Sequence, residues 1–181
     1  MPSAFGHVAP ALALVPLFRT PRPPARLWLA GVACAVAPDL DVLAFRFVPY
    51  ESMFGHRGIT HSLPCAALLA TLAVFAALPR PDPAVWRVRA WLYLFLAAAS
   101  HGLFDACTNG GRGVAFFAPF SAARFFVPFP PIEVSPIGVA RFFSERGAEV
   151  LRSELVWVWL PCAGFAAAAW ALRAALLPRR E

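Results

Sequence analysis

The sequence has no lysine, and all sixteen of its basic residues are arginine. Charged residues make up only 14% of the 181 residues, whereas hydrophobic residues make up 60% and mean hydropathy is +0.64. Ordinary soluble domains carry about 25% charged residues, and a small domain leaves much of its surface outside the core. The composition therefore excludes a disordered chain and an ordinary soluble monomer, and it indicates that lipid solvates much of the surface.

Two further absences narrow the class of site and partner. The four cysteines are widely spaced and form no CxxC pair, which argues against a thiolate zinc site or a disulfide framework. The net charge is +6, but no dense basic run with interleaved polar residues is present, so no nucleic-acid partner is expected. The length predicts one domain, residues 1–181.

Long apolar stretches predict an all-α fold, a multi-spanning transmembrane helix bundle of about four to five helices. The five stretches are residues 2–18, 27–45, 63–79, 90–106 and 155–177. At about 1.5 Å per residue, the last easily spans a hydrocarbon core of about 30 Å, and Pro161 inside it predicts a kink. The first two are marginal, and they predict short, tilted or re-entrant segments.

The arginines indicate an orientation for such a bundle. Three arginines lie in each of the segments 19–26, 80–89 and 173–180, which share one side if all five stretches cross. The positive-inside rule makes that side cytoplasmic. The other side receives residues 38–62 and the Pro-, Phe- and Gly-rich segment 106–153, which we expect to lie in the interface or cover a site.

Histidine and aspartate are scarce and clustered, with four residues of each type in the chain. Seven of these eight fall in the runs FGHVAP, PDLD, GHRGITHS and HGLFD, all on the side opposite the arginines. The eighth, Asp82, lies in an Arg-rich loop, where a solvated charge explains it. The clustered residues are His7, Asp39, Asp41, His56, His61, His101 and Asp105.

Imidazole and carboxylate together are typical ligands of zinc and related divalent ions, with manganese or magnesium as alternatives. His101 and Asp105 are four residues apart, so a helix places both on one face. Asp39 and Asp41 are expected to point differently, so that one ligates while the other bridges or orients a histidine. Seven such groups exceed one tetrahedral site, and two ions about 3.5–4 Å apart are the alternative.

Structural interpretations compete with this one. An aspartate after proline is common in turns and helix caps, and an HxxxD pair can be a helical ion pair. Thr60 or Ser62 could cap a helix starting near Leu63. None of these explains why nearly all the ionisable groups cluster, and such groups at membrane depth are costly and usually functional.

An N-terminal His7 followed by PDLD, HRGITHS and HGLFD resembles the membrane-bound, metal-dependent hydrolases typified by YdjM-like, LexA-binding inner-membrane proteins. The resemblance covers roughly residues 1–140. It implies a multi-pass protein of a bacterial or archaeal cytoplasmic membrane and a metal-dependent hydrolase activity.

A more remote similarity is to zinc-dependent phospholipase C and the related single-strand nucleases. It implies phosphoester hydrolysis at a multi-zinc centre. The chain has no second downstream HxxxD or HxxxE pair, and it has Met1 in place of the tryptophan ligand of those enzymes. The resemblance therefore implies one or two metal ions, not three.

These observations predict a membrane-embedded hydrolase whose metal activates a water near the extracytoplasmic face. Asp41 is the candidate base, and Arg57 is a candidate clamp for a phosphate or carboxylate oxygen, with a structural hydrogen bond as its alternative. Residues 116–129 could form a lid that contacts lipid or simply pack on the bundle, so membrane lipids and a lipid or amphiphilic substrate are the expected partners. A metal transporter, a metal-stabilised scaffold and a regulatory protein that binds a protein partner remain alternatives.

Overall fold

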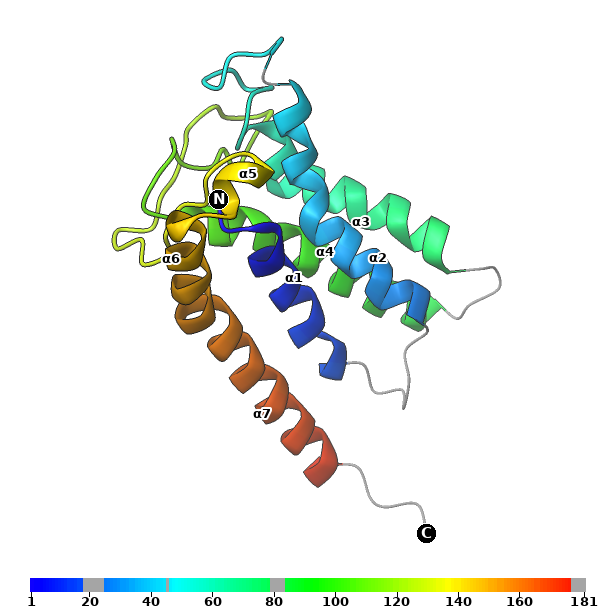
Figure 1. Cartoon of the computed structure of the whole chain (residues 1–181). Helices are drawn as coiled ribbons and strands as arrows, with labels where there is room; N and C mark the ends of the chain where they lie inside the picture. Colours follow the sequence, from blue (N-terminus) through cyan, green and yellow to red (C-terminus); the bar gives the residue numbers. More distant parts are fainter. Residues whose placement is uncertain (18–24, 45, 79–83, 177–181) are drawn as a thin grey trace.

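A computed structural model describes residues 1–17, 25–44, 46–78 and 84–176 (Figure 1). The chain is all-α, as the sequence predicts, and two isolated β-bridges are the only strand-like pairings in these four ranges. Several residues that entered the prediction of orientation, namely Arg19, Arg22, Arg80, Asp82, Arg179 and Arg180, lie outside the described residues.

The first half of the chain builds the bundle that carries the site. Helix α1 (Ala4–Ala13) begins at Ser3, whose hydroxyl accepts the Gly6 N–H, and a 3₁₀ turn, η1 (Val15–Leu17), follows it. Helix α2 (Ala25–Val36) continues directly into a 3₁₀ helix, η2 (Ala37–Ala44). The PDLD run, residues 38–41, therefore lies where the helix changes from α to 3₁₀ type, and the helical segment does not end there.

Helix α3 (Leu63–Ala77) begins where the sequence places a cap. Ser62 accepts the Cys65 N–H, and Pro64 occupies the first turn, where its missing N–H costs nothing. A 3₁₀ turn, η3 (Ile59–His61), precedes it. Helix α4 (Ala84–Ala106) begins six residues before the apolar stretch that predicted it, because the arginines in its first turns are compatible with helix.

The main core lies where α2, α3 and α4 pack together. Leu27, Ala70, Ala90 and Leu94 are fully buried in it. The Tyr93 hydroxyl donates to the Ala11 carbonyl and so ties α4 to α1.

A single continuous helix of 32 residues, Glu145–Leu176, ends the described chain. It comprises α6 (Glu145–Glu154), a π-helical turn, η4 (Leu155–Trp159), and α7 (Leu160–Leu176), after the short α5 (Val139–Phe142). The π turn lies just before Pro161. Proline has no backbone N–H, so the regular α-helical hydrogen-bond pattern cannot continue unchanged at this position. The helix changes direction between α6 and α7 (Figure 1), at the place where the sequence predicts a kink.

Among the residues that the structure describes, two helices are long and apolar enough to cross a membrane, Ala25–Ala44 and Glu145–Leu176. Ala4–Leu17 and Leu63–Ala77 are apolar but shorter. The expected number of four to five crossings therefore stays a prediction, whereas the helical character of all five stretches is confirmed.

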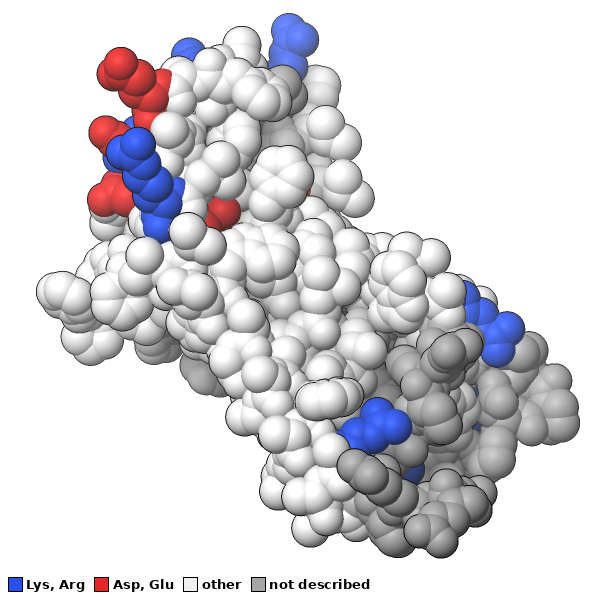
Figure 2. All heavy atoms as spheres, turned by 60° about the horizontal axis from the view of Figure 1, so that its bottom comes forward, with Lys and Arg blue, Asp and Glu red and all other residues white. Residues whose placement is uncertain are grey.

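Charge divides the molecule into two ends. The end formed by the start of α2, the start of α4 and the end of α7 carries Arg26, Arg87, Arg89 and Arg173. In Figure 2 the described side chains at this end include arginine and no acid, whereas the acidic atoms gather at the opposite end. There the acids pair with arginine, as Glu51 does with Arg112 at 2.7 Å.

Residues 107–138 form a long connection that packs across the end opposite the arginine-rich one. The Phe116 carbonyl accepts a hydrogen bond from the Leu63 N–H, and the Ala115 N–H donates to the backbone carbonyl of Arg57. Within this connection Val114 and Ala118 are buried, while Phe120 is 86% exposed. This segment therefore covers the polar end and presents phenylalanine outward, as an interfacial segment would.

Candidate metal centre

The structure brings the clustered histidines and aspartates together at one end of the bundle. His7 comes from α1, Asp39 from η2, His61 from η3, and His101 and Asp105 from α4. Two groups of side chains can hold a metal ion, each with its ligand atoms within 4.8 Å of one another. The groups are Asp39, His56, His61 and Asp105, and His7, His101 and Asp105.

His61 and His101 are oriented like metal-binding imidazoles. The His101 Nδ1 lies 2.7 Å from the Ala35 carbonyl, so it carries the proton and leaves Nε2 with its lone pair free. The His61 Nδ1 contacts Asp41 Oδ2 at 3.3 Å. The two Nε2 atoms consequently face each other at 3.1 Å.

Carboxylates converge on the same point. Asp39 Oδ1 lies 3.2 Å from the His101 Nε2 and 3.7 Å from the His61 Nε2. Asp105 Oδ2 lies 3.2 Å from the His61 Nε2. His7 stacks on His101 with ring centroids 3.6 Å apart, and its Nε2 is 3.6 Å from Asp105 Oδ1.

The donor set fits a divalent cation. Both ring nitrogens of His7, Asp39 Oδ1 and both oxygens of Asp105 are buried without a hydrogen-bond partner. Burying such groups unpaired is costly, and a carboxylate more so than an imidazole. A cation among these atoms would satisfy them together, and the mixture of imidazole and carboxylate suits zinc.

Asp41 lies behind these donors and contacts His56, a member of the first group. Asp41 Oδ1 contacts the His56 Nδ1 at 2.7 Å, and Asp41 Oδ2 accepts from the Thr60 hydroxyl at 2.8 Å. Because Asp41 also contacts the His61 Nδ1, it orients two imidazoles at once. The expected difference in direction between Asp39 and Asp41 is confirmed. The ligand and base roles predicted for Asp41 remain predictions.

Arg57 is buried and its guanidinium is held inside the protein. Its Nε lies 3.2 Å from Asp105 Oδ2, while Nη1 donates to the Gly110 carbonyl and Nη2 to the Thr108 hydroxyl. This geometry favours the structural alternative, in which Arg57 fixes Asp105 and the following loop. Its role as a clamp for substrate remains a prediction.

The turn around HRGITHS explains how Arg57 and His61 reach the centre. Arg57 has φ 60, a left-handed conformation that is strained for a residue with a side chain. At Gly58 a Cβ would lie 2.1 Å from the Met53 carbonyl oxygen, so only glycine fits. The tight turn therefore brings Arg57 and His61, from one short loop, to the same oxygen of Asp105, Oδ2, each at 3.2 Å.

The carboxylates change the protonation of His61. Burial alone would lower its pKa, but ion pairs with Asp105 and Asp39 raise the pKa to about 9 from the ordinary value of 6.5. In the absence of metal, a proton on His61 therefore offsets part of the negative charge of the cluster.

Two residues that position the site were missed from the sequence. Arg124 donates to the carbonyls of Tyr50, Ser52, His56 and Gly113. It is the one charged residue between positions 113 and 132, and that isolation was a usable signal. Glu154 accepts from the Ser3 hydroxyl at 2.7 Å and so ties α6 to the start of α1. Nothing in the local sequence marks that contact.

An all-α chain with membrane-crossing helices and a buried histidine–aspartate centre defines a membrane protein with a candidate metal site. The chain belongs to the YdjM inner membrane protein family, which matches residues 1–176. It is 41% identical over 162 residues to the inner membrane protein YbcI of Escherichia coli (strain K12), covering 89% of this chain and 92% of that protein. No solved structure matches the chain. The family resemblance seen in the motifs and the inner-membrane location are thereby confirmed.

Proposed function

We propose that this chain is a metal-dependent hydrolase that cleaves an ester or phosphoester bond of a lipid or another amphiphile. The observation that carries the proposal is the group of unpaired buried atoms on His7, Asp39 and Asp105 beside the facing Nε2 atoms of His61 and His101. Zinc is the first candidate, with manganese or magnesium as alternatives.

Asp39, His61, His101 and Asp105 would hold the first ion, with His7 completing a second position that shares Asp105. The ion would lower the pKa of a bound water and polarise the scissile oxygen. Asp41 would hold His56 and His61 in position, and its carboxylate is the candidate to take up a proton. Arg57 would hold the Asp105 carboxylate in place.

The exposed phenylalanines of the covering segment support an amphiphilic substrate. Phe120 and Phe129 are 86% and 80% exposed at the end of the bundle that holds the cluster. Exposed aromatic rings beside a membrane-crossing bundle favour the level of the lipid headgroups. The arginines at the opposite end support a site near the extracytoplasmic face.

A non-catalytic metal site is the second candidate, because the cluster is nearly closed. The side chains of His7, His61, His101 and Asp105 are fully buried, and the Asp39 side chain is 12% exposed. A closed donor set is typical of a structural ion, whereas a catalytic ion keeps an open position.

The deciding experiment combines metal analysis with hydrolysis assays on the detergent-purified chain. We expect bound divalent metal, and hydrolysis of phosphodiester or carboxylester substrates presented in phospholipid vesicles. His101→Ala and Asp105→Ala should lose both properties. Ser100→Ala is the matched control, because the Ser100 hydroxyl donates only to the Ala97 carbonyl of its own helix in the described contacts. Absence of metal from the wild type would refute the centre, and bound metal without hydrolysis would support the non-catalytic alternative.

A further inference from the structure

An apolar crevice runs along the inner side of α7, on a different part of the molecule from the metal centre. Two adjoining cavities of about 490 and 580 Å³ form it, and Phe165 lines both. Helix α7 and residues 96–104 of α4 form its walls, and α1 with η1 forms its floor. Cavities of about 300–1,000 Å³ are the size of ordinary ligand sites.

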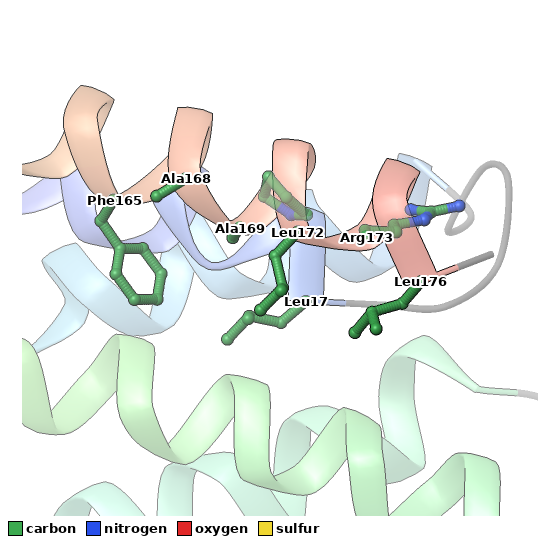
Figure 3. A pocket seen from close by; sticks show the side chains of 8 residues that line it. Leu17, Phe165, Ala168, Ala169, Leu172, Arg173 and Leu176 are labelled. Carbon is green, nitrogen blue, oxygen red and sulfur yellow. The ribbon is translucent and has the colours of Figure 1, made fainter.

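One wall of the crevice belongs to a helix that is little buried inside the protein. Only 6% of the most apolar window of the Glu145–Leu176 helix is buried. Figure 3 shows Phe165, Leu172 and Leu176 pointing from α7 toward the helices on the other side. Leu17 reaches into the same space from η1. In a bilayer such a lipid-facing space fills with hydrocarbon, since otherwise its lining loses van der Waals contacts.

The length of the crevice suits an acyl chain. Its α7 wall extends from Pro161 to Leu176, which corresponds to about 22 Å at about 1.5 Å per residue. One leaflet contributes about 15 Å of the hydrocarbon thickness. An extended chain from a single lipid can therefore lie within the crevice.

Positive charge at one end of the crevice favours an anionic lipid headgroup. Arg173 lines the crevice in the last turn of α7, where Figure 3 shows it at the end of the row of lining side chains. Arg26, Arg87 and Arg89 lie at the same end of the bundle. Basic side chains at the membrane surface attract anionic lipid.

We propose that the crevice between α7 and the α1–α4 wall binds an anionic phospholipid, with its acyl chain along Phe165 and Leu172 and its phosphate at the arginine-rich end of the bundle, near Arg173. The lipid would fill the space that separates α7 from α4 and hold the long helix at a fixed distance. The site is independent of the hydrolase function, because no metal-centre residue lines it.

The alternative occupant is α7 from a second copy of the chain. Ala168 and Ala169 line the crevice, and small residues allow close helix contact within a membrane. The experiment must therefore report both the bound lipid and the number of chains in each particle.

Native mass spectrometry of the detergent-purified chain measures both quantities. We expect a particle that retains phosphatidylglycerol in preference to phosphatidylcholine after exchange into mixed micelles of the two. Arg173→Gln should weaken that preference about fivefold, the effect of one basic residue at a membrane surface. Ala169→Trp should fill the crevice and remove the bound lipid.

Ala167→Trp is the matched control, since Ala167 is on the same helix but is not among the residues that line the two cavities. Its lipid content should equal that of the wild type, and helical content by circular dichroism should be unchanged in all three variants. Retention of phosphatidylglycerol by both Arg173→Gln and Ala169→Trp would overturn the proposal. So would a lipid-free dimer that Ala169→Trp converts into monomer. If Ala169→Trp fails to fold, the headgroup preference of Arg173→Gln alone decides.

Discussion

The Nε2 atoms of His61 and His101 lie 3.1 Å apart, although the two residues belong to different elements and are separated by forty positions. The Nδ1 of His101 is committed to the Ala35 carbonyl, and that of His61 contacts Asp41. Two imidazole lone pairs therefore face each other unless a proton or a cation lies between them. The competition between proton and cation leads to the first prediction.

Metal affinity should increase with pH between about 6.5 and 9. In the metal-free protein the carboxylates raise the pKa of His61 to about 9, so His61 is protonated over this range and must release its proton to the metal. The binding constant should rise by about tenfold for each pH unit while one proton is released. Isothermal titration in buffers of different ionisation enthalpy measures that proton, and a flat profile over this range would contradict the assignment.

The stability of the metal-free protein should change in the opposite direction. A raised pKa in the folded state gives stability that is complete below the unfolded value of 6.5 and is lost as pH rises through about 9. Melting temperatures in the presence of a chelator should therefore fall over the same range in which metal affinity rises. If the melting temperature of the metal-free protein rose with pH together with metal affinity, His61 could not be the titrating group.

Asp39→Asn and Asp41→Asn should separate a ligand from an orienting residue. Asp39→Asn removes a carboxylate that faces both Nε2 atoms, so metal binding should be lost. Asp41→Asn should keep the metal with about 10- to 100-fold lower affinity, as is usual for partners of ligating histidines. If Asp41 is instead the base, Asp41→Asn would keep its affinity while kcat falls, and competition with a fluorescent chelator distinguishes the outcomes.

Arg57→Gln should destabilise the metal-free protein more than the metal-bound protein. Removing the guanidinium takes one charge partner from the buried Asp105 carboxylate, which keeps His61, and breaking a buried ion pair typically costs up to about 3–5 kcal/mol. A bound cation supplies a replacement charge. Thermal melts with and without metal measure the difference.

Arg112→Gln is the control for Arg57→Gln. Arg112 also pairs with a carboxylate, that of Glu51, but the two side chains are 60% and 53% exposed. Exposed pairs contribute little to stability, so this variant should melt like the wild type under both conditions. An equal loss for Arg57→Gln in both metal states would point to a role in the loop rather than at Asp105.

Arg124→Met should loosen the segment that carries His56. Arg124 donates to the carbonyls of Tyr50, Ser52 and His56, and methionine keeps the bulk but none of these bonds. Hydrogen exchange of residues 50–56 should become faster. Arg152→Met, an exposed substitution on α6, is the control. Unchanged exchange in Arg124→Met would show that the turn at Gly58 holds the loop without Arg124.

Gly31→Ala should be strongly destabilising, whereas Gly164→Ala should not. A Cβ at Gly31 would lie 2.2 Å from the Tyr93 hydroxyl oxygen, while one at Gly164 meets nothing within 4 Å. Overpacking of a core costs about 1–3 kcal/mol, and an unhindered exchange of helical glycine for alanine is neutral or stabilising. Melting temperatures of the two variants test how tightly α2 and α4 pack.

The sequence was sufficient to predict which residues gather, because hydropathy and arginine distribution placed them at one end without any knowledge of the fold. It predicted the cap at Ser62 for a similar reason, since capping depends on neighbours within one turn. Local rules also located the irregularity at Pro161, though not its form as a π turn.

Such local rules could not predict contacts between distant parts of the chain. The bond from His101 to the Ala35 carbonyl, the engagement of Arg57 with Thr108, and the bond from Ser3 to Glu154 each depend on how helices pack. The sequence analysis also included residues 145–153 in the covering segment 106–153. They form helix α6 because polar residues such as glutamate and arginine also favour helix. This helix therefore begins before the apolar stretch 155–177.

The candidate donors come from four separate segments, at positions 7, 39, 56–61 and 101–105. A ribosome must therefore deliver the first hundred residues before the set is complete, and until then the early histidines and carboxylates lack their partners on α4. If the cluster holds a metal, as proposed, its capture would be a late event in biogenesis and would mark chains whose first four helices have assembled correctly. Quality-control proteases that act on unassembled membrane segments would have their longest opportunity before α4 arrives.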